Sequence, residues 1–328
     1  MSEYVLFIDL LGFKNSVKKD ENKARDLLLE FYEIIFNEIV NEQKIKGNAF
    51  SDSFIANSTD LQLLINFACR IYRRCFNYSF LEPTGRVVDK DPILPRGAIS
   101  KGDVDIKNLN ELENLKKNFI VSNALVHSAE IHDKVKGARL IISAAGYDEI
   151  SGIEEGIEPI IFQNTEIKVW ESHIYYDVLW FHDKSQISED VQATKSYIER
   201  LKEASLKILA KVKQSQNEEY LSQYTQTARI LLLDYSNYIE SNSDEVIKYI
   251  VNEYESEVFW EMWLLLLECI HTKSNEWLFA NETEMVLFIK KIVQSTGWSN
   301  LLKYINQKGN EYEKKVVENF INEMKCGL

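Results

Sequence analysis

The chain has 328 residues, enough for one large domain or two medium ones. Its 51 acidic and 38 basic side chains give a formal net charge of −13 at pH 7. This charge argues against binding to nucleic acid or to an anionic membrane, because both attract a surplus of Lys and Arg. The four cysteines have neither CxxC spacing nor neighbouring histidine pairs, so neither a zinc site nor a disulfide framework is indicated.

The first predicted element is a buried strand in residues 4–13, an apolar run (YVLFIDLLGF) that ends at Gly12 and carries a single carboxylate, Asp9. A carboxylate in a core is tolerated only when it is paired or bound to a metal. Residues 46–57 then predict a hairpin with Asp52 at its tip. Two carboxylates on neighbouring strand ends can hold hard cations, although local capping or pairing explains each of them equally well.

The remaining elements of the first half follow from periodicity and from the positions of Pro and Gly. Their order is β-α-β-β-α-β followed by α-β. This order predicts an α+β fold of the ferredoxin-like kind, an antiparallel sheet with helices packed on one face. In chain order the segments are a helix at 22–41, a hairpin at 44–50 and 53–58, a helix at 61–76, a strand at 93–104, a strand and helix at 118–136 and a strand at 138–143.

The composition changes towards the second half. All four prolines lie in the first half and only three glycines follow Gly156. Residues 160–181 are strand-like, and beyond about residue 186 the pattern is helical. The predicted helices there are 189–214, 218–240, 244–270, 283–295 and 298–325. We therefore predict two domains, an α/β domain at 1–185 and an all-α domain at 186–328 to which no role is assigned. With no signal peptide and no apolar run long enough to span a membrane, the expected location is the cytoplasm.

Five motifs occur in one order: FIDLLGF, FSDSF, PRGAIS followed by KGD, SNALVHSAE and ARLIIS. Over residues 4–180 this set resembles the class III nucleotidyl cyclase homology domain. It is most similar to the bacterial pyrimidine cyclases of Pycsar anti-phage defence. The resemblance implies a metal-dependent enzyme that converts a nucleoside triphosphate to a 3′,5′-cyclic mononucleotide and pyrophosphate. It also implies a head-to-tail homodimer with the sites formed between protomers.

The resemblance assigns roles to the residues of the first two motifs. Asp9 and Asp52 match the two aspartates that bridge two divalent ions, Mg²⁺ or Mn²⁺. The main-chain carbonyl of Leu10 matches a further metal ligand. The amides of residues 10–13 are expected against the phosphates, where Gly12 allows close approach of the backbone.

Base recognition departs from the adenylate cyclases in this resemblance. Asn48 stands where those enzymes carry the lysine that reads adenine, which disfavours purines. Phe50 and Arg96 match the residues that shape the smaller pyrimidine pocket, so UTP or CTP is the expected substrate and the choice between them is open. An ordinary strand residue is an equally good interpretation of Phe50.

A second departure lies in the helix after residue 118. Val126 and Glu130 occupy the positions of the Asn that orients the ribose and the Arg that stabilises the transition state, and neither can do that chemistry. The cation would then come from Lys101 or Arg139, although a solvated surface lysine is the simpler interpretation of Lys101. Two alternatives follow: a catalytically silent domain that binds a nucleotide or a partner, and a purely structural interaction protein without metal-dependent nucleotide binding.

Overall fold

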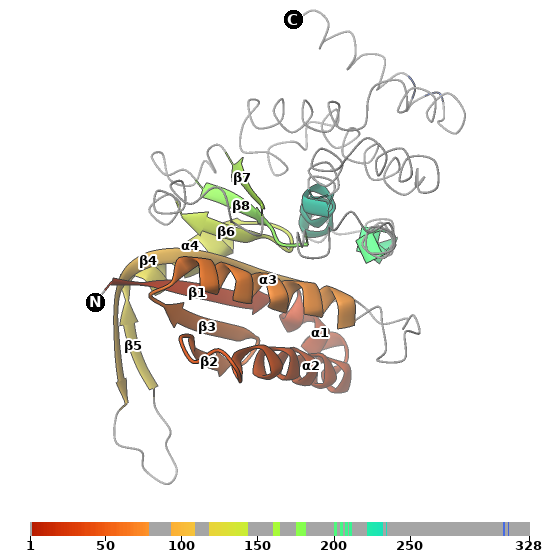
Figure 1. The fold of residues 1–328 in the computed structure, drawn as a ribbon. Helices are drawn as coiled ribbons and strands as arrows, with labels where there is room; N and C mark the ends of the chain where they lie inside the picture. Colours follow the sequence, from red (N-terminus) through yellow and green to blue (C-terminus); the bar gives the residue numbers. More distant parts are fainter. Residues whose placement is uncertain are drawn as a thin grey trace, which may run out of the picture. The chain divides into compact units, whose positions relative to one another are not determined.

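The first part of the chain folds around one eight-stranded sheet (Figure 1). The computed structural model describes residues 2–78, 93–108, 118–143, 160–164 and 175–181, and in the rest of the chain residues 200–201, 204–205, 207–208, 210–211, 222–231, 234, 311 and 314. The chain divides into one unit of residues 1–164 and 169–181 and another of residues 165–168 and 182–328.

The strands are β1 Ser2–Leu10, β2 Lys46–Phe50, β3 Ser53–Ser58, β4 Pro95–Asn108, β5 Asn118–Ser122, β6 Leu140–Ser143, β7 Ile160–Asn164 and β8 Tyr175–Leu179. The helices are α1 Phe13–Lys19, α2 Glu21–Ile39, α3 Leu61–Tyr78 and α4 Asn123–Lys134. The predicted hairpin and the helices and strands on either side of it are confirmed. Helix α1 was not predicted, because none of its residues is buried and its sequence therefore carries no apolar period.

The strand order is β2-β3-β1-β4-β6-β8-β7, with β5 paired to β4. The first four strands pair with one another antiparallel, with α2 between β1 and β2 and α3 between β3 and β4 in the chain. This is the ferredoxin-like arrangement that the sequence predicts. Beyond it the prediction of an antiparallel sheet is wrong, because β6 pairs with β4 in parallel. Helix α4 provides the crossover that a parallel pair requires.

Helices cover both faces of the sheet, which corrects the prediction of one covered face. Side chains alternate between the faces along a strand. Ile8 pairs with Phe54, whose ring lies 6.1 Å from that of Phe67 on α3. Val5 instead packs in a cluster with Ala124 of α4. The two helices of the ferredoxin-like unit therefore share one face, and α4 covers the other.

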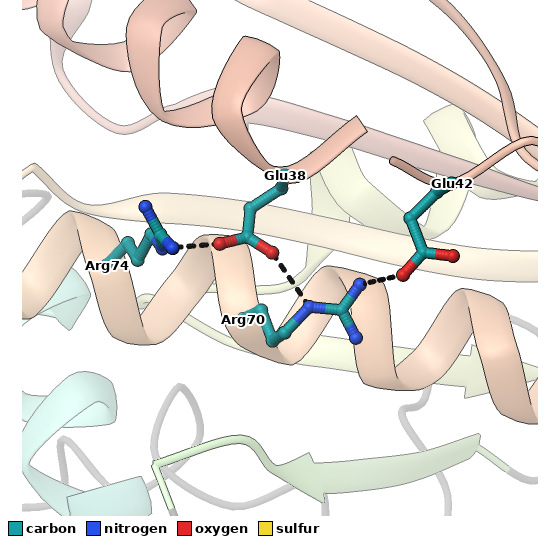
Figure 2. A network of polar contacts seen from close by, with 4 residues as sticks. All are labelled: Glu38, Glu42, Arg70 and Arg74. Carbon is teal, nitrogen blue, oxygen red and sulfur yellow. Dashed lines mark hydrogen bonds and ion pairs between the residues drawn. The ribbon is translucent and has the colours of Figure 1, made fainter. Parts of the chain in front are cut away.

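Polar side chains fix α2 against α3. Glu38 of α2 is buried and lies between Arg70 and Arg74 of α3, as Figure 2 shows. Arg70 Nε donates to Glu38 Oε2 at 2.7 Å, and its Nη2 pairs with Glu42. A buried carboxylate is stable only with such partners. The network fixes the relative position of the two helices at the end of α2.

In the second unit, the described residues 200–201, 204–205, 207–208, 210–211, 222–231 and 234 are helical. They fall within the helices predicted at 189–214 and 218–240. The helices predicted at 244–270 and 283–295 lie outside the described residues. Among the described residues, no helix is long and apolar enough to cross a membrane.

Candidate functional site

One end of the sheet collects residues from three of the sequence motifs. Asp9 near the end of β1 pairs with Ser53 at the start of β3 and with Arg96 at the start of β4. Ser53 in turn pairs with Phe50 at the end of β2. Because directly paired residues point to the same side of a sheet, Phe50, Ser53, Asp9 and Arg96 form one row across four strands. The row lies on the face that α4 covers further along.

The turn between β2 and β3 places Asp52 beside this row. Ser51 adopts a left-handed backbone conformation with φ 51°, which is uncommon for a residue other than glycine. The amide of Leu10 donates to the Asp52 carbonyl at 3.1 Å, which fixes the turn against the end of β1. Asp9 and Asp52, which are 43 positions apart in the sequence, are thus brought to adjacent strand ends, as their proposed common task requires.

Arg96 spans the space between Asp9 and the end of α4. Its Nη2 lies 3.6 Å from Asp9 Oδ2, and the two side chains are 13% and 20% exposed. Its Nη1 donates to the carbonyl of Val135, the residue at the C-terminus of α4, at 3.2 Å. Arg96 therefore places a positive charge next to the first predicted metal ligand in a chain whose net charge is strongly negative.

The loop after β1 differs in part from the expectation. The amide of Leu10 donates to Asp52, and the amide of Leu11 donates to the carbonyl of Leu94 at 2.9 Å, so these two amides are used within the protein. Gly12 has φ 75° and begins α1. The amide of Phe13 belongs to the first turn of that helix, where helix geometry provides no acceptor within the helix. The amides that the loop can offer a phosphate are thus those at its junction with α1.

The two predicted sources of a transition-state cation have other surroundings than expected: Lys101 lies far from Asp9 along the strand, and Arg139 pairs with a buried carboxylate. Lys101 pairs with Tyr4 on β1 and lies five residues after Arg96 on β4, about 17 Å away at the usual rise of a strand. Its Nζ lies 5.5 Å from the centroid of the Tyr4 ring. Arg139 is buried and forms a two-pronged ion pair with Asp177, with Nε to Oδ1 at 2.7 Å and Nη2 to Oδ2 at 2.6 Å.

Helix α4 presents the two divergent positions away from its packed face. Ala124 is fully buried, and the hydroxyl of Ser128 donates to the Val5 carbonyl at 3.1 Å, so this side of the helix lies on the sheet. Val126 is 54% exposed on another side, and Glu130 is partly exposed. Neither side chain is needed to hold the helix on the sheet.

Tyr32 is a site neighbour that the sequence analysis missed. Its hydroxyl, on α2, donates to the carbonyl of Ser51 at 2.5 Å. Burial raises the pKa of Tyr32 above its ordinary value, and the negative charge of Asp52 adds to this rise. The only signal in the sequence is a hydroxyl beside the apolar residues of the stretch FYEIIF, and it does not indicate the partner.

This end of the sheet holds oxygen donors of the kind that divalent metals prefer. Two carboxylates and the main-chain carbonyl of Leu10 are hard oxygen donors of the kind Mg²⁺ and Mn²⁺ prefer. The described residues include no group of three or more His, Cys, Asp or Glu side chains that could hold a metal alone. Mg²⁺ is commonly bound by one or two carboxylates together with substrate phosphates. Asp9 and Asp52 match that pattern.

No protein-family model and no curated protein matches the chain. Solved structures of adenylate and guanylate cyclases do. A monomeric Trypanosoma brucei adenylate cyclase is 14% identical, with 55% of this chain and 90% of that one covered at a TM-score of 0.43. The P. aeruginosa adenylyl cyclase CyaB is 14% identical. The match covers 54% of this chain and 93% of CyaB, with a TM-score of 0.44. The guanylate cyclase domain of RhGC from Catenaria anguillulae, in complex with GTP, is 17% identical. The match covers 54% of this chain and 95% of that domain, with a TM-score of 0.40.

Proposed function

We propose that the chain is a metal-dependent nucleotidyl cyclase that acts on a pyrimidine nucleoside triphosphate. The observation that carries the proposal is the pairing of β1 with β3 and β4, because it gathers Asp9, Asp52 and Arg96 from three motifs at one end of the sheet. The motif order supports the same assignment. A role of the cyclic product as a signal in anti-phage defence rests on the motif resemblance.

The reaction joins the ribose 3′-oxygen to the α-phosphorus and breaks the bond from the α-phosphorus to the bridging oxygen of pyrophosphate. The proton of the 3′-hydroxyl is lost in this step. Two divalent ions, Mg²⁺ or Mn²⁺, would lower the pKa of that hydroxyl and neutralise negative charge on the triphosphate when bound. In this proposal Asp9 and Asp52 hold the ions, and the carbonyl of Leu10 adds a ligand.

The protein itself contributes orientation and local positive charge. In this proposal the backbone of Gly12 and Phe13, which follows β1, lies against the phosphates, as the motif resemblance implies. Gly12 lets the backbone approach closely. Arg96 offsets the charge of Asp9 and, through Val135, joins this end of the sheet to α4.

The predicted base pocket places a constraint on assembly. Phe50 is 51% exposed and lies at one end of the row, with Arg96 at the other. Three strand spacings separate them, about 14 Å, which is wider than one pyrimidine ring. We therefore propose that Phe50 of one protomer and Arg96 of the other face the same base in a head-to-tail homodimer.

A second candidate is a catalytically silent domain that binds a nucleotide. Two observations on the predicted sources of a transition-state cation favour it. Arg139 already has a buried counter-charge in Asp177, and Lys101 lies near the middle of β4, five residues from Arg96. The position of Arg96 beside Asp9 favours the catalytic candidate, because it places a cation next to a predicted metal ligand.

The test is incubation of the purified full chain with each of the four ribonucleoside triphosphates and Mn²⁺, with products identified by mass spectrometry. The proposal predicts a cyclic pyrimidine mononucleotide and pyrophosphate, and no product from the Asp52→Ala variant. Triphosphate binding without any product would instead establish the silent domain. Absence of both binding and product would reject the two candidates together.

A further inference from the structure

We infer that Tyr32 is a positioning residue for Asp52, acting through the turn that joins β2 and β3. The inference rests on the proposed function, in which Asp52 binds a divalent metal. The contact is a hydrogen bond of 2.5 Å from the Tyr32 hydroxyl to the Ser51 carbonyl, between residues 19 positions apart. Ser51 immediately precedes Asp52, so a restraint on its carbonyl is a restraint on the peptide that leads into the metal ligand.

The turn needs such a restraint because of its backbone conformation. Ser51 has φ 51°. A side-chain-bearing residue keeps a left-handed conformation only where the surrounding structure imposes it. Two contacts do so here: the Leu10 amide on the Asp52 carbonyl, at 3.1 Å, and the Tyr32 hydroxyl on the Ser51 carbonyl. The turn is therefore held by β1 and by α2.

The packing of helix α2 fixes the backbone from which the Tyr32 side chain extends. Phe31, next to Tyr32, is fully buried, and its ring centroid lies 6.4 Å from that of Tyr32. Two turns further along, Glu38 is held between Arg70 and Arg74 of α3 (Figure 2). The backbone position from which Tyr32 extends is therefore fixed by the packing of the helix.

The Tyr32 phenol is a hydrogen-bond donor at this contact. A phenol has an ordinary pKa of about 10, so its hydroxyl is protonated across the physiological range and can donate to a carbonyl. Burial, and then the nearby charge of Asp52, raise the pKa of Tyr32 further.

The test is the affinity of the full chain for the Mn²⁺ complexes of 3′-deoxy-UTP and 3′-deoxy-CTP, which lack the attacking hydroxyl, measured by equilibrium dialysis. The variants are Tyr32→Phe and, as a control that also removes one hydroxyl, Ser128→Ala. The Ser128 hydroxyl on α4 donates to a backbone carbonyl too, that of Val5 at 3.1 Å. Val5 lies four residues before Asp9 on β1, about 13 Å away at the usual rise of a strand. Asp52→Ala defines the signal without the site, and thermal unfolding of each variant reports its folding.

Hydrogen-bond partners of metal ligands typically change metal affinity 10- to 100-fold. Tyr32 acts on the residue before the ligand, so we expect the lower end of this range, a dissociation constant raised about tenfold in Tyr32→Phe. Ser128→Ala should leave the constant unchanged. An unchanged constant for Tyr32→Phe, or an equal loss in both variants, overturns the inference while the proposed function stands. If the proposed function fails, the wild-type chain binds these complexes no more tightly than Asp52→Ala, and both ideas are overturned.

Discussion

Replacing Asp177 by Asn should destabilise the first unit more than any surface substitution. Asp177 and Arg139 are buried, with side chains 1% and 6% exposed, and they share two short hydrogen bonds. The substitution leaves the Arg139 guanidinium buried without its counter-charge. Breaking a buried pair in this way costs about 3–5 kcal/mol in the free energy of unfolding. For a unit of this size, about 2–4 °C per kcal/mol converts that loss to a fall in melting temperature of about 6–20 °C.

The assay is thermal unfolding followed by circular dichroism, with Asp26→Asn as the matched control. Asp26 pairs with Arg25 at 3.6 Å, but both side chains are well exposed, so its loss should change stability by about 1 kcal/mol or less. A double variant, Arg139→Met with Asp177→Leu, removes both charges and should recover most of the loss. A melting temperature of Asp177→Asn equal to that of Asp26→Asn would refute the reasoning. It would also reopen Arg139 as a residue free to meet a substrate.

Three further outcomes are expected. Gly97→Ala should lower the free energy of unfolding by about 1–3 kcal/mol, because a Cβ there would lie 2.5 Å from the backbone oxygen of Phe7; wild-type stability in a denaturant titration would contradict this. Cys75 is buried, and burial raises the pKa of its thiol. Iodoacetamide at pH 8 should therefore label Cys75 only in denaturant. Rapid labelling of Cys75 in the native chain would contradict its buried position. Mixing inactive Phe50→Ala and Arg96→Ala chains should restore activity if the two residues meet across a dimer. One of the two sites in each mixed dimer then has both residues intact. If mixed dimers form without recovery of activity, both residues belong to the site of one protomer.

The parts of the fold that the sequence predicts are those that depend on local pattern. The apolar run of β1, the hairpin around Asp52 and the amphipathic helix α3 each follow from a few neighbouring residues. The parallel pairing of β6 with β4 and the placement of α4 on the second face do not. Periodicity states which side of an element is buried, but not which partner buries it.

The candidate site divides in the same way. Asp9 and Asp52 stand out in the sequence because each is a carboxylate at a strand end, and motif order connects them. The Tyr32 contact with Ser51 and the pairing of Arg139 with Asp177 join residues 19 and 38 positions apart. Only the packing of the elements brings such residues together, so no local pattern indicates them. Tyr32 thereby contacts the turn that carries Asp52, and Arg139 pairs with a buried carboxylate.

The measurement that tests the central claim most directly is the initial rate of cyclic nucleotide formation with Mn²⁺ and the preferred triphosphate, for wild-type, Asp52→Ala and Asp26→Asn chains. Loss of a metal ligand should remove several kcal/mol of transition-state stabilisation, about a 1,000-fold fall in rate, from Asp52→Ala alone. Asp26→Asn should match the wild type. Equal rates for Asp52→Ala and wild type, with both chains folded, would contradict a metal site at this end of the sheet.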